Sequence, residues 1–425
     1  MLAERLHSTI EDPYAAVREA RNPADVVPQG LTNHFKDLVK RAVIRTAFPG
    51  QRPGRVIHRF LDKAQRETPF RFVIEDEHDA IANADLILMD HQGPKMDDIG
   101  GVDGDNPETV RGTGGSEGLY AHALLPPHTR YVLKNYLVSL PVRNAVRALA
   151  RFDLQAAKKE LSQIFMALAF RKTRPIVVDR TTEKPPREQG APPKGNTPKE
   201  RRRIREARRA PHRTYVEGMR EERRRTATEI CRSVQEGTPV MLFPEGTRSN
   251  DGKIQGFVSE YFQSIVTDYI LPRLEDSREI RIGILAADIL SAFPDGVGTD
   301  VRAYDAPITL RGFAYDPAII IAALRERMQQ DRSPLTETEI KRFGRTMLMD
   351  ARRQMAEGLV GILKRGESAD RGDGAGITEP ASGAAAARPE DDANAARMPP
   401  DRRVSETPVA PELASPPGAT RPELP

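Results

Sequence analysis

The sequence is poor in cysteine and in long apolar runs. Its single cysteine, Cys231, excludes an intrachain disulfide framework and lies in a helical pattern, so we expect a small buried apolar residue rather than a nucleophile. No uninterrupted apolar stretch approaches the ~20 residues that span a bilayer, and Met1 to Tyr14 lacks the apolar core of a secretory signal. We therefore expect a cytoplasmic chain, with any membrane contact peripheral at the inner membrane face.

The composition divides the chain into a core-forming part and polar parts. Hydrophobic residues make up 38% of the 425 residues and the mean hydropathy is −0.54, which indicates long polar segments. We predict an N-terminal helical extension over 1–65 and an α/β domain over 66–365 with a Pro- and Arg-rich insertion at 181–225. The tail, 366–425, is rich in Ala, Pro and Asp. It has too few large apolar residues to offset the entropy of ordering, so we predict disorder there.

Positive charge is the main electrostatic feature. The net charge is +4 and the pI about 9.1, with dense arginine between Lys199 and Arg225. Such a run is usually a solvated helix face. The functional alternative is a surface that binds an anionic membrane or an acidic carrier protein. Nucleic acid is not an expected partner, because no aromatic stacking pattern or zinc framework accompanies the arginines.

Apolar runs alternate with helical patterns along the chain. Helices are expected at 142–170, 226–235, 258–271 and 318–328, and a capping box at Thr336 and Glu339 predicts a last helix that ends near Lys364. Strands are expected at 70–74, 85–89, 175–180, 240–243, 280–289 and 306–313. This alternation predicts an α/β fold with a central, mostly parallel sheet flanked by helices.

The helical pattern of 142–170 carries a set of large apolar side chains. Core packing explains these positions, and the alternative is that some of them line an acyl groove. They are Val146, Leu149, Leu154, Leu161, Ile164, Phe165 and Leu168.

The most informative segment is the strand-like run at 240–243 and the residues after it. Pro244, Glu245, Gly246, Thr247 and Arg248 follow the run directly. Ends of parallel strands are where open α/β sheets bind ligands. The planar fork of an arginine there suits a phosphate or a carboxylate.

The string FPEGTRS at 243–249 resembles the third conserved block of the glycerophospholipid acyltransferases. Other blocks of that family have similar segments here. His91 follows the run 85–89, as in the first block, with Asp97 one position beyond the family spacing and Met96 in its place. Arg180 ends the run 175–180, as in the second block. The fourth block corresponds to 280–285, which has no proline. The resemblance covers roughly 70–290 and implies an acyltransferase-like fold.

The resemblance implies a role for each of these residues. His91 would be the general base, with Asp97 orienting its ring and Asp98 or Asp90 as substitutes. Arg180 and Arg248 would bind the acceptor phosphate, helped by backbone N–H groups at Gly246 and Thr247. Glu245 would orient an arginine or the acceptor. Taken alone, His91 would merely end a strand, and Arg180 would form a surface ion pair with Asp179 or Glu183.

The implied activity is acyl transfer from acyl-CoA or an acyl carrier protein to a glycerol-phosphate lipid, with no cofactor and no metal. FPEGTRS favours 1-acylglycerol-3-phosphate as the acceptor over glycerol 3-phosphate. The alternative is a catalytically inactive relative that binds lipid or a protein partner. Three departures from the family pattern favour that alternative. Asp97 is displaced by one position, Asp90 stands where the family has asparagine, and the fourth block has no proline.

Overall fold

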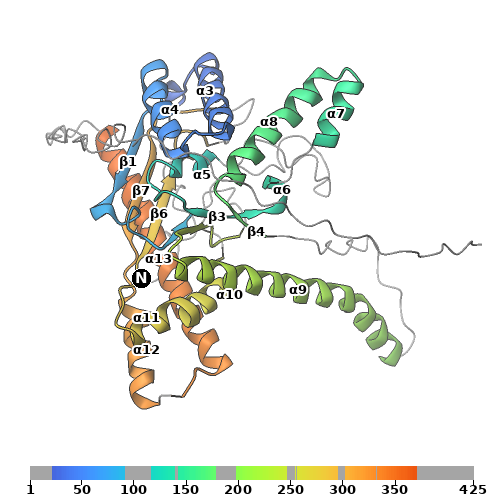
Figure 1. The fold of residues 1–425 in the computed structure, drawn as a ribbon, viewed down its shortest axis with the longest axis vertical. Coiled ribbons are helices and arrows are strands. Elements are labelled where there is room, and N and C mark those ends of the chain that lie inside the picture. The colour runs from blue at the N-terminus through green and yellow to red at the C-terminus, as the bar shows by residue number, and fades with distance from the viewer. Residues whose placement is uncertain are drawn as a thin grey trace, which may run out of the picture. The chain divides into compact units, whose positions relative to one another are not determined.

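A seven-stranded sheet is the centre of the described part of the chain (Figure 1). The computed structural model describes residues 22–90, 116–138, 142–178, 198–246, 254, 256–294, 302–331 and 333–370. All of them belong to one unit, Met1–Gly372; the other unit, Asp373–Pro425, lies outside the described residues. The strands are β1 (Phe72–Asp76), β2 (Leu86–Met89), β3 (Arg130–Lys134), β4 (Ile176–Val178), β5 (Val240–Leu242), β6 (Ile282–Asp288) and β7 (Ile308–Ala314).

Most strand pairs in this sheet are parallel. The strand order is β1-β7-β6-β2-β5-β3-β4, and only β6 and β7 pair in the antiparallel sense. Strands β6, β2, β5, β3 and β4 therefore end at the same edge, while β1 and β7 run the opposite way. Every residue of β2 and β5 is buried, as expected for central parallel strands covered on both faces.

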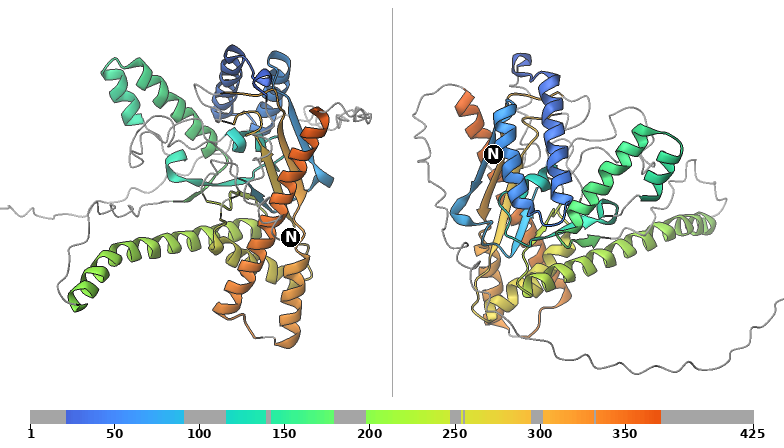
Figure 2. Two further views of the ribbon diagram at one scale, coloured as in Figure 1. Left: turned by 180° about the vertical axis from the view of Figure 1, so that it is seen from behind. Right: turned by 45° about the horizontal axis from the view of Figure 1, so that its top comes forward.

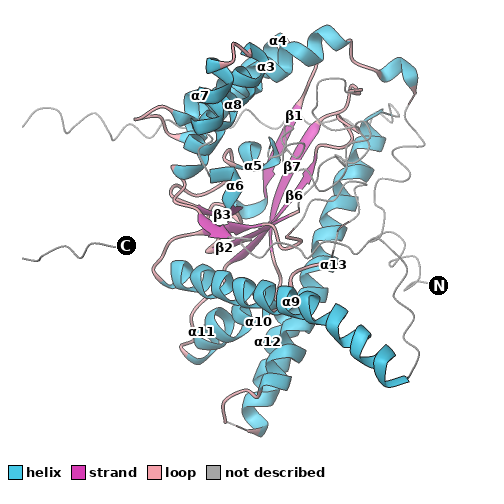
Figure 3. Cartoon of the chain, turned by 90° about the vertical axis from the view of Figure 1, so that its right-hand side faces the viewer, coloured by secondary structure: helices cyan, strands magenta, loops and turns pink. Residues whose placement is uncertain are grey.

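Helices lie on both faces of the sheet (Figures 2 and 3). The first group consists of α3 (Gln29–Ala47), α4 (Pro53–Glu67), α5 (Ser116–Ala121), α6 (Asn135–Val138), α7 (Val142–Ala150) and α8 (Leu154–Arg171). The second consists of α9 (Pro198–Gln235), α10 (Ser259–Ser264), the π-helical segment η4 (Ile265–Ile270), α11 (Leu271–Glu275), α12 (Ala318–Gln330) and α13 (Glu337–Asp370). Two 3₁₀ turns, η1 (Pro23–Asp25) and η2 (Glu77–Asp79), complete the described elements. The predicted α/β fold, a mostly parallel sheet flanked by helices, is confirmed.

The first face of the sheet is packed with aromatic rings. Phe35 of α3 lies 4.6 Å from Phe70 and 5.5 Å from Phe293, measured between ring centroids. Phe60 of α4 stacks on Tyr120 of α5 at 6.1 Å. These rings form one cluster with sheet residues such as Met89 and Met241. Helices α3 and α4, in the segment predicted as an N-terminal extension, thus share a core with the sheet.

The second face of the sheet packs against α9, α10, η4, α12 and α13. Cys231 of α9 is 3% exposed within this cluster, so the expectation of a small buried residue is confirmed. Glu339 Oε2 accepts a hydrogen bond from Thr336 N, and Thr336 Oγ1 accepts one from Glu339 N, which is the predicted capping box. Among the described helices, none combines the length and the apolar character that crossing a membrane requires.

Some elements differ from the sequence predictions. Strand β3 was not predicted. Helix α9 joins the arginine-rich stretch and 226–235 into one helix that begins at Pro198, within the predicted insertion. Helix α13 runs to Asp370, six residues beyond the predicted end at Lys364. The predicted helical stretch 142–170 is broken between α7 and α8. The predicted tail from 371 onward lies outside the described residues.

The expectation that the large apolar residues of 142–170 pack in the core was wrong for four of them. Two of them lie on α7, which contacts α8 and whose buried residues are the small Ala145 and Ala148, and the other two lie on α8. The exposed ones are Val146, Leu149, Leu154 and Leu161.

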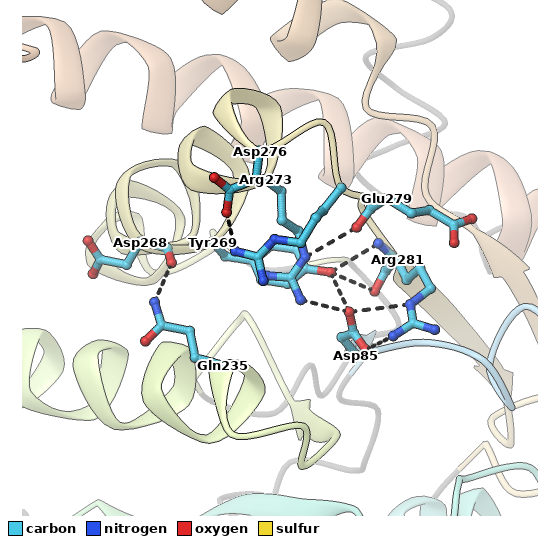
Figure 4. Close-up of polar contacts among 9 residues, drawn as sticks. Asp85, Gln235, Asp268, Tyr269, Arg273, Asp276, Glu279 and Arg281 are labelled. Atoms are coloured by element: carbon cyan, nitrogen blue, oxygen red, sulfur yellow. Dashed lines mark hydrogen bonds and ion pairs between the residues drawn. The ribbon is translucent and has the colours of Figure 1, made fainter.

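Asp85, directly before β2, holds the amino ends of two strands together (Figure 4). Its Oδ1 accepts a hydrogen bond from Arg281 Nη2 at 2.7 Å, next to β6. Its Oδ2 accepts hydrogen bonds from Arg273 Nη2 at 3.0 Å and from Tyr269 Oη at 3.1 Å. The Arg273 guanidinium stacks 3.9 Å above the Tyr269 ring. Burial, and then the Asp85 charge, raise the pKa of Tyr269, which stays a neutral donor. A single carboxylate thus links β2, β6, η4 and α11.

Asp85→Asn is expected to lower the free energy of unfolding by about 1–3 kcal/mol, because it leaves two guanidinium groups without their counter-charge. The Arg273 side chain is only 11% exposed, so water screens it poorly. Urea denaturation measures the change. The matched control is Glu337→Gln, which removes an ion pair with Lys341 whose side chains are 75% and 57% exposed, and it should change stability by less than about 0.5 kcal/mol. Equal effects of the two substitutions would contradict a structural role for Asp85.

Candidate functional site

The candidate site lies at the edge where β6, β2, β5, β3 and β4 end. Strands β2 and β5 are neighbours and pair in parallel, with Leu86 opposite Val240 and Leu88 opposite Leu242. The chain therefore leaves both strands side by side at the same edge. In the sequence, His91 comes two positions after the end of β2, and the string FPEGTRS begins directly after β5.

The described residues include only two of the predicted site residues, Glu245 and Gly246. His91, Asp97, Arg180, Thr247 and Arg248 lie outside the described residues, and their predicted roles stay predictions. The strands that lead to them are described. Strand β4, which precedes Arg180, runs parallel to β5 and is separated from it by β3, so it ends at the same edge.

The segment after β5 forms a tight turn over Phe243, Pro244, Glu245 and Gly246. Gly246 N donates a hydrogen bond to Phe243 O at 3.0 Å, with proline at the second position, as β-turns favour. Gly246 has a φ of +64°, and a Cβ there would lie 3.0 Å from Val258 Cγ2. Glycine satisfies both constraints. Glu245 is 4% exposed, which agrees better with a buried orienting group than with a solvent-facing base.

Buried carboxyl groups stand at three neighbouring strand ends. Asp90, directly after β2, is 1% exposed, and its Oδ1 accepts a hydrogen bond from Ala287 N of β6 at 2.8 Å. Asp288, the last residue of β6, is 4% exposed and accepts one from Ser291 N at 3.0 Å. Glu245 is the third. The sequence suggested Asp90 as a substitute partner for His91 and as a departure from the asparagine of the resembling family, but it did not predict the hydrogen bond by which Oδ1 of Asp90 connects β2 to β6. The sequence feature that could have predicted this group is an acidic residue at or just after the end of the apolar runs of β2, β5 and β6.

A half-buried histidine, His122, and a buried tyrosine, Tyr131, lie on the first face beside β5, and neither was predicted from the sequence as a site residue. Tyr131 of β3 donates its hydroxyl hydrogen to Gly118 O of α5 at 3.2 Å. The His122 ring lies 5.0 Å from the Tyr131 ring. Burial lowers the pKa of His122 to about 4, so the imidazole is neutral at pH 7. A Cβ at Gly118 would contact the Phe243 ring at 3.8 Å, so α5 packs against the start of the turn after β5.

The described residues offer no metal centre, since no three His, Cys, Asp or Glu side chains among them are arranged to hold an ion. Burial raises the pKa of the Cys231 thiol to about 12, which removes it as a nucleophile at neutral pH. The carboxyl groups of Asp90, Asp288 and Glu245 are described at this edge, and the segments that begin at 91, 179 and 247 lie outside the described residues. No family model, curated protein or solved structure matches the chain.

His122 predicts a specific pH dependence of stability. Above a pH of about 6.5 the His122 ring is neutral in both the folded and the unfolded state, and its contribution to the free energy of unfolding is fully present. As the pH falls from there toward 4, the His122 ring is protonated in the unfolded state but stays neutral in the folded state, so the free energy of unfolding decreases. Between pH 7 and pH 5 this loss should be at most about 2 kcal/mol.

The test compares the pH dependence of the wild type with that of His122→Gln, by urea denaturation at both pH values. The variant should lose less stability on acidification, while carboxyl groups contribute equally to both proteins. The matched control is His58→Gln, which changes an exposed histidine of α4 and should behave like the wild type. Parallel stability curves for the wild type and His122→Gln would contradict the lowered pKa.

Proposed function

We propose that this chain transfers a fatty acyl group from an acyl thioester to a hydroxyl of a glycerol phosphate in phospholipid synthesis. The favoured acceptor is 1-acylglycerol-3-phosphate, with glycerol 3-phosphate as the alternative, and the donor is acyl-CoA or an acyl carrier protein. In this proposal the fold is acyltransferase-like. The reaction takes place in the cytoplasm, with peripheral contact at the inner membrane face because the acceptor is a lipid.

One observation carries the proposal, namely the parallel pairing of β2 with β5. Strands β2 and β5 end side by side, and in the sequence His91 comes two positions after β2 while Arg248 comes six positions after β5. A base and a phosphate-binding arginine must both reach one acceptor molecule, and neighbouring strand ends are compatible with that requirement. The described part of the segment after β5 consists of the buried Glu245 and the tight turn that Gly246 closes.

The proposed reaction is a direct transfer. A ring nitrogen of His91 takes the proton of the acceptor hydroxyl, and the hydroxyl oxygen attacks the thioester carbonyl carbon. The tetrahedral intermediate then collapses as its C–S bond breaks, and the leaving thiolate takes the proton from the His91 imidazolium. Asp97 stabilises the imidazolium while it exists. No covalent enzyme intermediate is needed, in agreement with the buried and protonated Cys231.

The second candidate function is lipid binding without turnover. The observation in its favour is Asp90, which stands where the resembling family has asparagine and whose Oδ1 accepts a hydrogen bond from Ala287 N.

To distinguish the two functions, the chain is incubated with acyl-CoA or acyl carrier protein and with either acceptor, and acylated product is followed by mass spectrometry. Product from any donor and acceptor pair supports the transferase; tight acceptor binding without product supports the second candidate.

His91→Ala should lower kcat by at least about 10²-fold, because it removes the base that activates the hydroxyl. The midpoint of thermal unfolding should stay within a few degrees of the wild type. His58→Ala, at an exposed position of α4, is the control and should keep full activity. Unchanged turnover in His91→Ala would rule out His91 as the base.

Arg248→Lys should raise the KM for the phosphate-bearing acceptor by about tenfold or more, because lysine keeps the charge and loses the two-pronged hydrogen-bond geometry. The KM for the thioester donor should change less. Arg55→Lys, at an exposed position of α4, controls for a general effect of the exchange. A rise of equal size in both KM values would remove Arg248 from the phosphate site.

A further inference from the structure

Helix α7 and the turn that follows it expose a contiguous set of large apolar side chains. Val142, Val146 and Leu149 are spaced as i, i+4 and i+7, so they share one face of α7, and they are 49%, 60% and 48% exposed. Phe152 in the turn is 90% exposed and Leu154 is 73% exposed. Figures 1 and 2 show α7 at the outer end of α8, away from the sheet. Packing within the described part of the chain does not account for this face.

The turn after α7 holds a phenylalanine where glycine is usual. Asp153 N donates to Ala148 O at 3.0 Å and Phe152 N donates to Leu149 O at 3.0 Å, which is the hydrogen-bond pattern of a Schellman motif. Phe152 occupies the left-handed position of that motif with a φ of +56°. A side chain there costs about 1 kcal/mol relative to glycine. The Phe152 side chain is almost fully exposed, so packing within the described residues does not offset this strain, and this points to a role in binding.

The net charge around this apolar face is positive. From Val142 to Leu154 the sequence contains three arginines and one acidic residue, Asp153, which leaves a net charge of +2. Arg147 and Arg151 are exposed, and neither has a side-chain hydrogen bond or an ion pair with the described residues. At about 100° per residue they point to the face of α7 opposite the stripe formed by Val142, Val146 and Leu149, so apolar and basic side chains occupy different faces of this helix. A short basic amphipathic helix with an unpacked apolar face matches the chemistry of an anionic lipid surface.

We propose that residues 142–154 are a lipid-docking surface that inserts Val146, Leu149 and Phe152 into the interface of an anionic phospholipid membrane. The arginines contact the headgroups while the apolar side chains enter the acyl boundary. This inference goes beyond the proposed acyl transfer and does not depend on it. It also assigns membrane contact to α7 rather than to the arginine-rich part of α9.

The chain contains no tryptophan, so one introduced tryptophan reports on a single place. In the full chain, Phe152→Trp should show a blue-shifted emission maximum with vesicles of phosphatidylglycerol and phosphatidylcholine. Brominated acyl chains should quench that emission. The matched control is Ile319→Trp, at a 52% exposed position of α12, which should show neither effect. Unchanged emission from Phe152→Trp, or equal shifts in the two variants, would overturn the proposal.

A second pair of variants measures the contributions to binding by vesicle sedimentation. Val146→Ser with Leu149→Ser should weaken binding about tenfold or more, since two apolar side chains no longer enter the membrane. Arg147→Gln with Arg151→Gln should remove the preference over vesicles of phosphatidylcholine alone. All four substituted positions are exposed, so the melting temperatures of both variants should match that of the wild type. If the serine variant changes a dimer into a monomer and still binds vesicles normally, the face is an interface between two copies and the proposal is wrong.

Discussion

The rest of this structure depends on the parallel pairing of β2 with its two neighbours. Leu86 pairs with Val240 of β5 on one side and with Ile282 of β6 on the other. The four residues of β2 are buried on both faces, which ties the strand to the aromatic cluster of the first face and to the helices of the second. Because β2 pairs with both β5 and β6, its register with each of them determines where the ends of those two strands lie beside its own end.

Two carboxylates hold this central strand at its opposite ends. Asp85 binds Arg273, Arg281 and Tyr269 at the amino end, and Oδ1 of Asp90 binds Ala287 N at the carboxyl end. Both therefore connect β2 to the region of β6. Asp85 binds two guanidinium groups, and Oδ1 of Asp90 accepts its hydrogen bond from a backbone N–H. The candidate site lies at the Asp90 end, where the chain continues to His91.

The sequence predicted the parts of the fold that local pattern determines. The apolar runs of β2, β5 and β6 are bounded by charged, proline or glycine residues, and Thr336 with Glu339 has the spacing of a capping box. Strand β3 was missed because its alternation of Tyr131 and Leu133 is too short to distinguish from a turn.

Non-local contacts set the features that the sequence did not predict. The hydrogen bond of Asp90 joins residues 197 positions apart, which no local pattern reveals. The spacing of α7 predicted a helix, but packing through Ala145 and Ala148 decided that its larger side chains stay exposed. At the candidate site, the ends of the strands were predictable from the apolar pattern, whereas no local pattern predicted that Glu245 is buried.

We propose that a base and a carboxylate follow β2, beside the turn after β5. A crystal structure of the chain with a bound acceptor would give the distance between a His91 ring nitrogen and the Asp97 carboxylate oxygens. We expect ~2.6–3.2 Å, because a hydrogen bond must fix the ring for proton transfer. A His91 ring buried among apolar groups, with no carboxylate within reach, would contradict it.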